Sequence, residues 1–107
     1  MQRKLVIYET NEGKRPFSDW LKSLKDRKAR AIIRARLERV RLGNLGNCEP
    51  VGRGVSELKI YHGPGYRVYF GQDGEEIIVL LSGGDKSTQS RDINRAYTLW
   101  EDYKNAR

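Results

Sequence analysis

Charged and phenolic side chains alternate with apolar ones along residues 56–70, SELKIYHGPGYRVYF. Successive side chains of a strand point to opposite faces of a sheet. A hairpin in this segment therefore places its apolar residues on one face: Leu58, Ile60, Val68 and Phe70. The other, solvent-facing side then carries the chemically active residues: Glu57, Lys59, Tyr61, Arg67 and Tyr69. A surface this rich in Lys, Arg and Tyr is suited to a phosphate backbone with exposed bases.

The elements around this hairpin follow from periodicity and turn signals. A first strand is expected at residues 4–9. A short helix is expected to begin near Pro16, and its inner face should carry Phe17, Trp20, Leu21 and Leu24. A second helix is expected from 27 to 42, with Ala29, Ile32, Ile33, Leu37 and Val40 inward, and Gly43 ends it. Residues 43–54, rich in Gly, Asn and Pro, are expected to form an irregular loop.

The second half of the chain reads as strands followed by a helix. Strands are expected at 55–61, 66–71 and 76–82, the last as an unbroken apolar run typical of a central strand. A loop at 83–86 should lead to a last helix, capped by Thr88 or Ser90 and buried through Ile93, Ala96, Tyr97 and Trp100. The order β-α-α-β-β-β-α predicts one α+β domain over residues 1–107. Its sheet should be mainly antiparallel, with a helical hairpin on one face and the first strand at an edge.

The charge of the chain is strongly basic and unevenly distributed. Lys and Arg number 21 against 14 acidic residues, a net charge of +7, and the sequence pI is near 9.8. Residues 25–41 hold eight of the basic residues against Asp26 and Glu38, which accounts for nearly all of the excess. Such a segment is compatible with nucleic acid or with an acidic protein partner, and also with an ordinary solvated helix face.

Several classes of protein are disfavoured. Cys48 is the only cysteine, so an intrachain disulfide is impossible and a cysteine-based metal site is not expected. The apolar run near the N-terminus is too short for a signal peptide or a membrane span, so a cytoplasmic protein with no membrane association is expected. Gly83-Gly84-Asp85-Lys86 lacks the spacing of a nucleotide triphosphatase loop.

The chain resembles the RelE/ParE superfamily of type II toxins, and within it the HigB-like "probable addiction module killer protein" subgroup. The resemblance extends over nearly the whole chain. It rests on LKIYHGPGYRVYF, on LLSGGDKSTQSRDI and on PFSDWLKSL, taken in their order and spacing. It implies a RelE-like fold and a cognate antitoxin, often of helix-turn-helix type. RelE-like and HigB-like members act at the ribosome and cut mRNA, whereas ParE-like members inhibit DNA gyrase without cutting anything.

The resemblance, together with residue chemistry, suggests roles for an mRNA endoribonuclease that uses the 2′-OH of its substrate, with no metal or cofactor. Arg67 matches the family's hairpin arginine and would stabilise the phosphate through its planar fork of donors. Lys59 or Glu57 would be the base, and Lys86 would hold a phosphate. Gln89, Tyr61, Tyr69 and Arg91 would bind RNA.

Plainer alternatives stay open at this stage. Lys59 and Arg67 could be a solvated sheet face paired with Glu57, and Tyr61 and Tyr69 could be core or cover residues. Lys86 and Gln89 could simply open a helix. His62, the only histidine, lies at the hairpin turn and is a minor candidate for acid–base work. Beyond the mRNA endoribonuclease, two functions remain: a gyrase inhibitor on the same fold, and an inactive module that binds RNA or the antitoxin.

Overall fold

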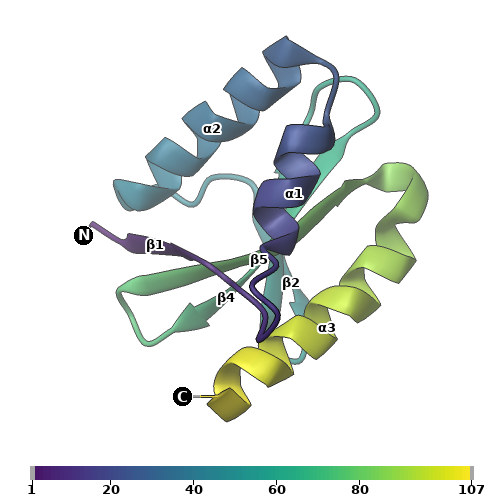
Figure 1. The fold of residues 1–107 in the computed structure, drawn as a ribbon. Helices are drawn as coiled ribbons and strands as arrows, with labels where there is room; N and C mark the ends of the chain where they lie inside the picture. The colour runs from purple at the N-terminus through teal and green to yellow at the C-terminus, as the bar shows by residue number, and fades with distance from the viewer. Residues whose placement is uncertain (1, 107) are drawn as a thin grey trace.

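The computed structural model describes residues 2–106, which form two layers of helices around one central sheet (Figure 1). The strands and helices, in chain order, are β1 (Lys4–Ile7), α1 (Pro16–Ser23), α2 (Arg27–Arg41), β2 (Cys48–Gly52), β3 (Val55–Ile60), β4 (Tyr66–Asp73), β5 (Ile77–Asp85), the short 3₁₀ helix η1 (Lys86–Thr88) and α3 (Gln89–Ala106). The protein is therefore of α+β class, with one strand more than the sequence pattern predicted.

The sheet of residues 2–106 has five strands in the order β1-β5-β4-β3-β2. Strands β2 to β5 are antiparallel neighbours, and β1 pairs with β5 in parallel at one edge, where Lys4 is opposite Ile77 and Ile7 is opposite Leu80. The predicted edge position of the first strand is confirmed. The sheet is mixed, and β5 lies inside it, as its continuous apolar run indicated.

The expectation of an irregular loop at 43–54 is wrong, because β2 pairs with β3 along the second edge of the sheet. Pro50 is tolerated there because the outer side of an edge strand needs no N–H donor. The link to β3 is a two-residue turn at Arg53 and Gly54, both with positive φ, 53° and 82°. Positive φ at both central positions is the geometry that matches the twist of hairpin strands.

One face of the sheet is covered by α1 and α2. Leu58, Ile60, Val68 and Phe70 point to this face together, as their alternation predicted, and they pack against residues of both helices, among them Phe17 and Ile33. The apolar sides predicted for the first two helices are confirmed by the same core. Pro16 is the first residue of α1, where its missing N–H leaves no unmade bond.

The opposite face was expected to be open to solvent, and that expectation is wrong for most of its length. α3 lies across it, and Val55, Tyr69, Val79, Leu81 and Trp100 form a second core there. The predicted inner side of α3 is confirmed by Ala96 and Trp100, which are buried, and by Ile93 and Tyr97, which pack against the same core. In Figure 1 the sheet passes between α2 and α3, which cover opposite faces.

A bulge in β5 changes which face its side chains meet. Tyr69 is opposite Ser82 but Phe70 is opposite Leu80, so Leu81 is an extra residue in β5. Leu81 and Ser82 consequently both point toward α3. The strand also runs three residues further than predicted, through Gly83, Gly84 and Asp85.

The beginning of the last helix also differs from the prediction. Asp85 is the cap: its carboxylate accepts a hydrogen bond from the backbone N–H of Ser87 at 2.8 Å. η1 then continues directly into α3 at Gln89. Thr88, one of the two expected caps, instead donates its hydroxyl hydrogen bond to Asp92 at 2.5 Å. None of the described helices is long and apolar enough to cross a membrane.

Replacing Trp100 tests the core beneath α3. Its side chain is only 4% exposed. Trp100→Ala should lower the free energy of unfolding by about 3–5 kcal/mol, because it leaves a large cavity against the sheet. Urea denaturation followed by circular dichroism measures the change. Thr98→Ala on the exposed side of α3 is the control, expected within about 0.5 kcal/mol of the parent; equal curves for Trp100→Ala and the parent would contradict the core assignment.

Candidate functional site

A buried cluster of polar side chains lies where β3, β4 and the start of α3 meet. Arg67 Nε donates a hydrogen bond to Glu57 Oε1 at 3.0 Å, and Arg67 Nη1 donates to the backbone oxygen of Gly65 at 2.8 Å. Gln89 Nε2 lies 3.1 and 3.2 Å from the two carboxylate oxygens of Glu57. Glu57 is 3% exposed and Arg67 is 9% exposed. The predicted active residues therefore meet, but as an ion pair held under a helix start.

The sheet register brings these side chains together. Glu57 is opposite Tyr69 and Lys59 is opposite Arg67, so Glu57 and Arg67 are diagonal neighbours on the same face. On the other side of β4, Arg67 is opposite Gly84. Because Gly84 has no side chain, the guanidinium meets no β5 side chain at that position. The first residue of α3, Gln89, then contacts Glu57 from the α3 side of the sheet.

The arrangement leaves one end of the guanidinium unbonded within residues 2–106, because Nε and Nη1 are engaged and Nη2 has no recorded partner. Glu57 and Gly65 thus hold the plane of Arg67 in one orientation. An arginine fixed in this way is pre-organised to bind phosphate oxygens through the N–H donors of Nη2.

The two predicted lysines border this cluster. Lys59 lies directly opposite Arg67, but its Nζ is 3.2 Å from Glu49 Oε1 on β2, in an ion pair that the sequence did not suggest. Lys86 is exposed on η1. A β-carbon built on Gly65 would lie 3.4 Å from Arg67 Nη1 and 3.8 Å from Lys86 Cβ, so both side chains originate beside the same turn. Lys59 is thus a cross-strand neighbour of Arg67, and Lys86 starts beside the turn that binds the guanidinium of Arg67.

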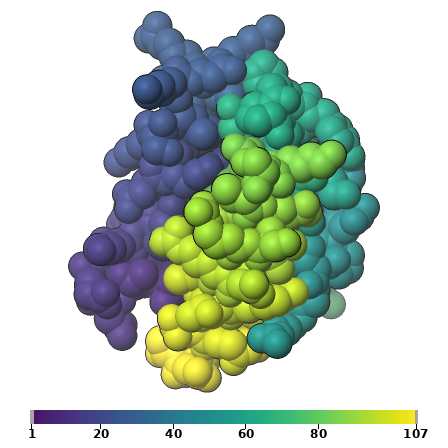
Figure 2. Space-filling view, turned by 90° about the vertical axis from the view of Figure 1, so that its right-hand side faces the viewer, coloured from purple at the N-terminus to yellow at the C-terminus, as the bar shows by residue number. Residues whose placement is uncertain are grey.

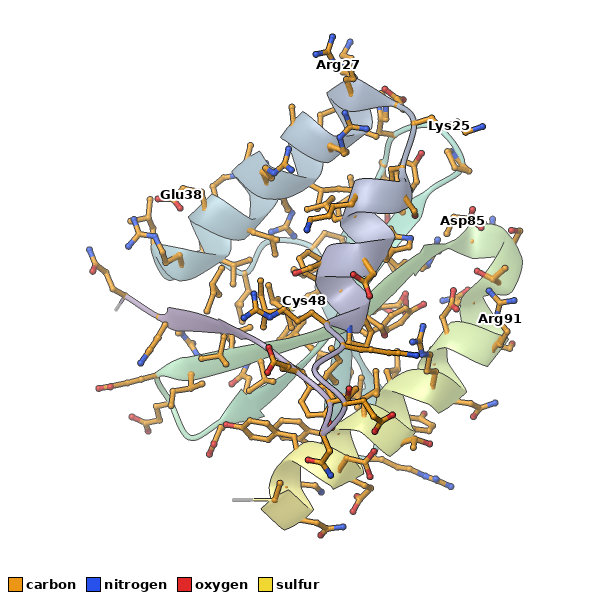
Figure 3. All side chains as sticks on the ribbon, in the orientation of Figure 1. Lys25, Arg27, Glu38, Cys48, Asp85 and Arg91 are labelled. Carbon is orange, nitrogen blue, oxygen red and sulfur yellow. The ribbon has the colours of Figure 1, made fainter. Side chains whose placement is uncertain are left out.

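The residues predicted to bind RNA have very different surroundings. Tyr69 is fully buried, so its predicted stacking on a nucleotide is not possible in this structure, and it belongs to the core instead. Burial is the main reason that the pKa of its hydroxyl is raised well above the usual value. Tyr61 is 79% exposed and accepts a hydrogen bond from Asn47 Nδ2 at 3.0 Å. Arg91 is exposed on α3, as the labelled side chain in Figure 3 shows. Gln89 faces Glu57.

His62 lies away from the cluster and links two elements. Its Nε2 is 3.0 Å from Asp26 Oδ2, and its ring stacks on Tyr66. Asp26 is also the cap of α2, accepting hydrogen bonds from the backbone of Lys28 and Ala29. The histidine thus holds the β3–β4 turn against the start of α2, and the hydrogen bond from His62 is the largest cause of a lowered pKa at Asp26.

The Arg-rich helix α2 has an exposed basic side and one buried exception. Arg27, Lys28, Arg34 and Arg39 are exposed. Arg36 is buried, and its Nη2 donates to the backbone oxygen of Asn47 at 3.2 Å. Burial lowers the pKa of this guanidinium. No group of three or more His, Cys, Asp or Glu side chains in the described part of the chain is placed to hold a metal ion.

Sequence reasoning missed the interactions that enclose Arg67. The contact of Gln89 with Glu57 depends on η1 running directly into α3, and the pair of Lys59 with Glu49 depends on the unpredicted strand β2. The two-residue Arg53-Gly54 turn was the signal that could have revealed β2.

The site changes the expected outcome of an Arg67 truncation. On an open face Arg67→Ala would leave the fold unaffected, but here it leaves the buried carboxylate of Glu57 without its charge partner. We expect each of Arg67→Ala and Glu57→Ala to lower the free energy of unfolding by about 3–5 kcal/mol. The double variant should lose less than the sum of the two, with a coupling of about 1–3 kcal/mol in denaturation curves. Strict additivity would show that the pair is not formed.

The contact between His62 and Asp26 makes a prediction about pH. His62→Ala should raise the pKa of Asp26 part of the way back to its ordinary value of 3.8, because the backbone hydrogen bonds at the cap remain. Carboxyl NMR titration measures this. The folded-state pKa of Asp26 is lower than its ordinary value of 3.8. The stabilisation by the Asp26 carboxylate is therefore complete above pH 3.8 and is lost as the pH falls through the folded-state pKa. An unchanged Asp26 titration in the variant would show that His62 does not contact it.

Most of the chain is similar to known proteins. Residues 19–101 match the model of the family described as "Phage derived protein Gp49-like (DUF891)". An uncharacterized protein of Haemophilus influenzae (strain Rd) is 46% identical to the chain over 83 residues, which are 78% of this chain and 84% of that protein. The matched residues include all of α2 to β5 and the cluster around Arg67.

Proposed function

The chain belongs to the phage-derived Gp49-like family, a family of addiction-module toxin type, and on this premise we propose that it cleaves RNA as the toxin of a type II toxin–antitoxin pair. Membership of this family implies an antitoxin partner in general terms. The specific proposal is a HigB-like, metal-independent endoribonuclease that acts on mRNA at the ribosome and so inhibits translation. Its antitoxin would be a helix-turn-helix protein.

The observation that carries the proposal is the fixed guanidinium of Arg67 with cations beside it. Cleavage of RNA through its own 2′-OH passes through a phosphorane with extra negative charge on its oxygens. Arg67 offers Nη2, oriented by the bonds of Nε to Glu57 and of Nη1 to Gly65. Lys86, exposed on η1 beside Gly65, would hold the same or the adjacent phosphate. Donors that are already oriented cost no reorganisation when the charge develops.

The other roles are assigned from the contacts of each residue. Both carboxylate oxygens of Glu57 accept hydrogen bonds from Gln89, and one of them also accepts from Arg67, so we assign Glu57 to positioning. Lys59 lies opposite Arg67 and is more accessible, so we assign it as the base, once the incoming RNA displaces Glu49. Tyr61, the most exposed aromatic residue of the hairpin, is suited to stacking on a nucleotide. Ribosomal contacts would fall on the exposed arginines of α2.

A brief pulse of expression in bacteria, followed by primer extension on cellular mRNA, tests the proposal. The parent chain should produce cuts within coding regions. Arg67→Lys keeps the charge but loses the planar fork, and it should reduce cutting by about 10²–10³-fold. Lys22→Ala, an exposed cation of α1, is the control and should cut like the parent.

The alternatives give different results in the same cells. DNA damage with intact transcripts would indicate that the chain is a gyrase inhibitor and not an endoribonuclease. Growth and translation unaffected by the parent chain would indicate an inactive binding module. The melting temperature of purified Arg67→Lys is measured beside that of the parent. Equal melting temperatures show that the loss of cutting comes from the missing guanidinium and not from unfolding.

A further inference from the structure

A hollow of about 510 Å³ lies between the start of α1 and the first half of α3, outside the Glu57–Arg67 pair. We call it the α1–α3 groove; its lining includes Lys14, Asp19, Trp20, Gly83, Arg91 and Arg95. Figure 2 shows the N-terminal part of the chain, in purple and blue, beside α3 on this face. We propose that this groove binds single-stranded RNA continuing from the Arg67 site. The inference rests on the proposed function and adds a second binding site to it.

The exposed charge of the groove favours a polyanion. Lys14, Arg91 and Arg95 are exposed, whereas Asp19 is the one fully exposed carboxylate in the described lining. The other two carboxylates of the lining are engaged: Asp85 accepts from Ser87, and Asp92, which is buried, accepts from Thr88. Asp92 Oδ1 also lies 3.6 Å from Arg91 Nε, but the side chain of Arg91 stays 79% exposed and its outer nitrogens remain open to a phosphate. Arg91 and Arg95 are four residues apart, so they project from the same side of α3. A phosphate chain along this side would meet both guanidinium groups.

The floor of the groove is formed by an aromatic ring and the end of β5. Trp20 is half-buried against the backbone of Gly83, where an added β-carbon would lie only 2.2 Å from Trp20 Cε3. Its inner side packs against the rings of Phe17 and Tyr66, with centroids 6.0 and 6.1 Å away, so only its outer part lines the groove. β1 pairs with β5 only as far as Leu80, so residues 81–85 have a strand partner on the β4 side alone among the described residues. An indole beside arginines is the combination that binds stacked bases and their phosphates without sequence preference.

The groove is continuous with the Arg67 site. A second, smaller hollow at the start of α3 is lined by residues that include Lys86 and Gln89, and it shares Thr88 and Arg91 with the first. Lys86 in turn begins beside Gly65, which accepts the hydrogen bond of Arg67. A strand bound at Arg67 can therefore pass Lys86 and Arg91 and enter the groove. An acidic protein segment would also satisfy the cations, but it brings no base to stack on the part of Trp20 that lines the groove.

Binding of 2′-O-methylated RNA, which cannot be cleaved through its 2′-OH, separates this inference from catalysis. Fluorescence anisotropy of a labelled strand of about 12 nucleotides, long enough to cover both sites, is measured at several salt concentrations. Arg91→Ala/Arg95→Ala should weaken binding about tenfold, and the slope of log K against log salt should fall by about 1.4. Asp19→Asn should tighten binding. A strand of about three nucleotides, too short to reach the groove from the Arg67 site, should respond little to the double variant.

Lys4→Ala/Lys22→Ala, which replaces two exposed cations of β1 and α1 that line neither hollow, removes the same charge from the surface outside the groove and is the matched control. Equal weakening by both double variants would overturn the inference, because net charge alone would then explain it. Displacement of the RNA by poly-glutamate as readily as by unlabelled RNA would assign the groove to an acidic protein instead. If the parent chain fails to bind the RNA while transcripts are still cut in cells, the groove proposal fails and the proposed function stands.

Discussion

The buried ion pair between Glu57 and Arg67 constrains the architecture around it. Two charged groups at this depth are tolerated only where each finds further hydrogen bonds. Gly65 supplies one from the β3–β4 turn, and Gln89 supplies two from the first residue of α3. The turn between two strands and the start of the last helix are therefore held at the same point. The same bonds hold the guanidinium of Arg67 in a single orientation, with the two N–H donors of Nη2 left for a ligand.

The bulge in β5 has a comparable effect on the neighbouring surface. Because Leu81 and Ser82 both point toward α3, the two glycines that follow face opposite sides of the sheet. Gly83 then lies under Trp20 of α1, and Gly84 lies under Asp92 of α3, in both cases too close for a β-carbon. Two helices on opposite faces thus approach the same end of β5, and the groove between them follows from this approach.

The site residues and the groove together describe a surface suited to a flexible polyanion. Arg67 is the most constrained cation of this surface, and Lys86, Arg91 and Arg95 are increasingly distant from it along η1 and α3. A constrained arginine suits transition-state charge, whereas mobile surface cations contribute affinity that depends on salt. Membership of a family of addiction-module toxin type is the context in which this surface is interpreted.

The sequence by itself determined the α+β class, the faces of the hairpin strands and the inner faces of the helices, since these depend on periodicity within one element. It also placed Glu57 and Arg67 on one face and left their pairing open, but it did not relate Gln89 to them. Only the tertiary structure decided that α3 covers their face of the sheet, that Tyr69 is core, and that β2 supplies Glu49 to Lys59. Those outcomes depend on which element packs on which face, and a bulge of one residue in β5 can change that without leaving a pattern in the chain.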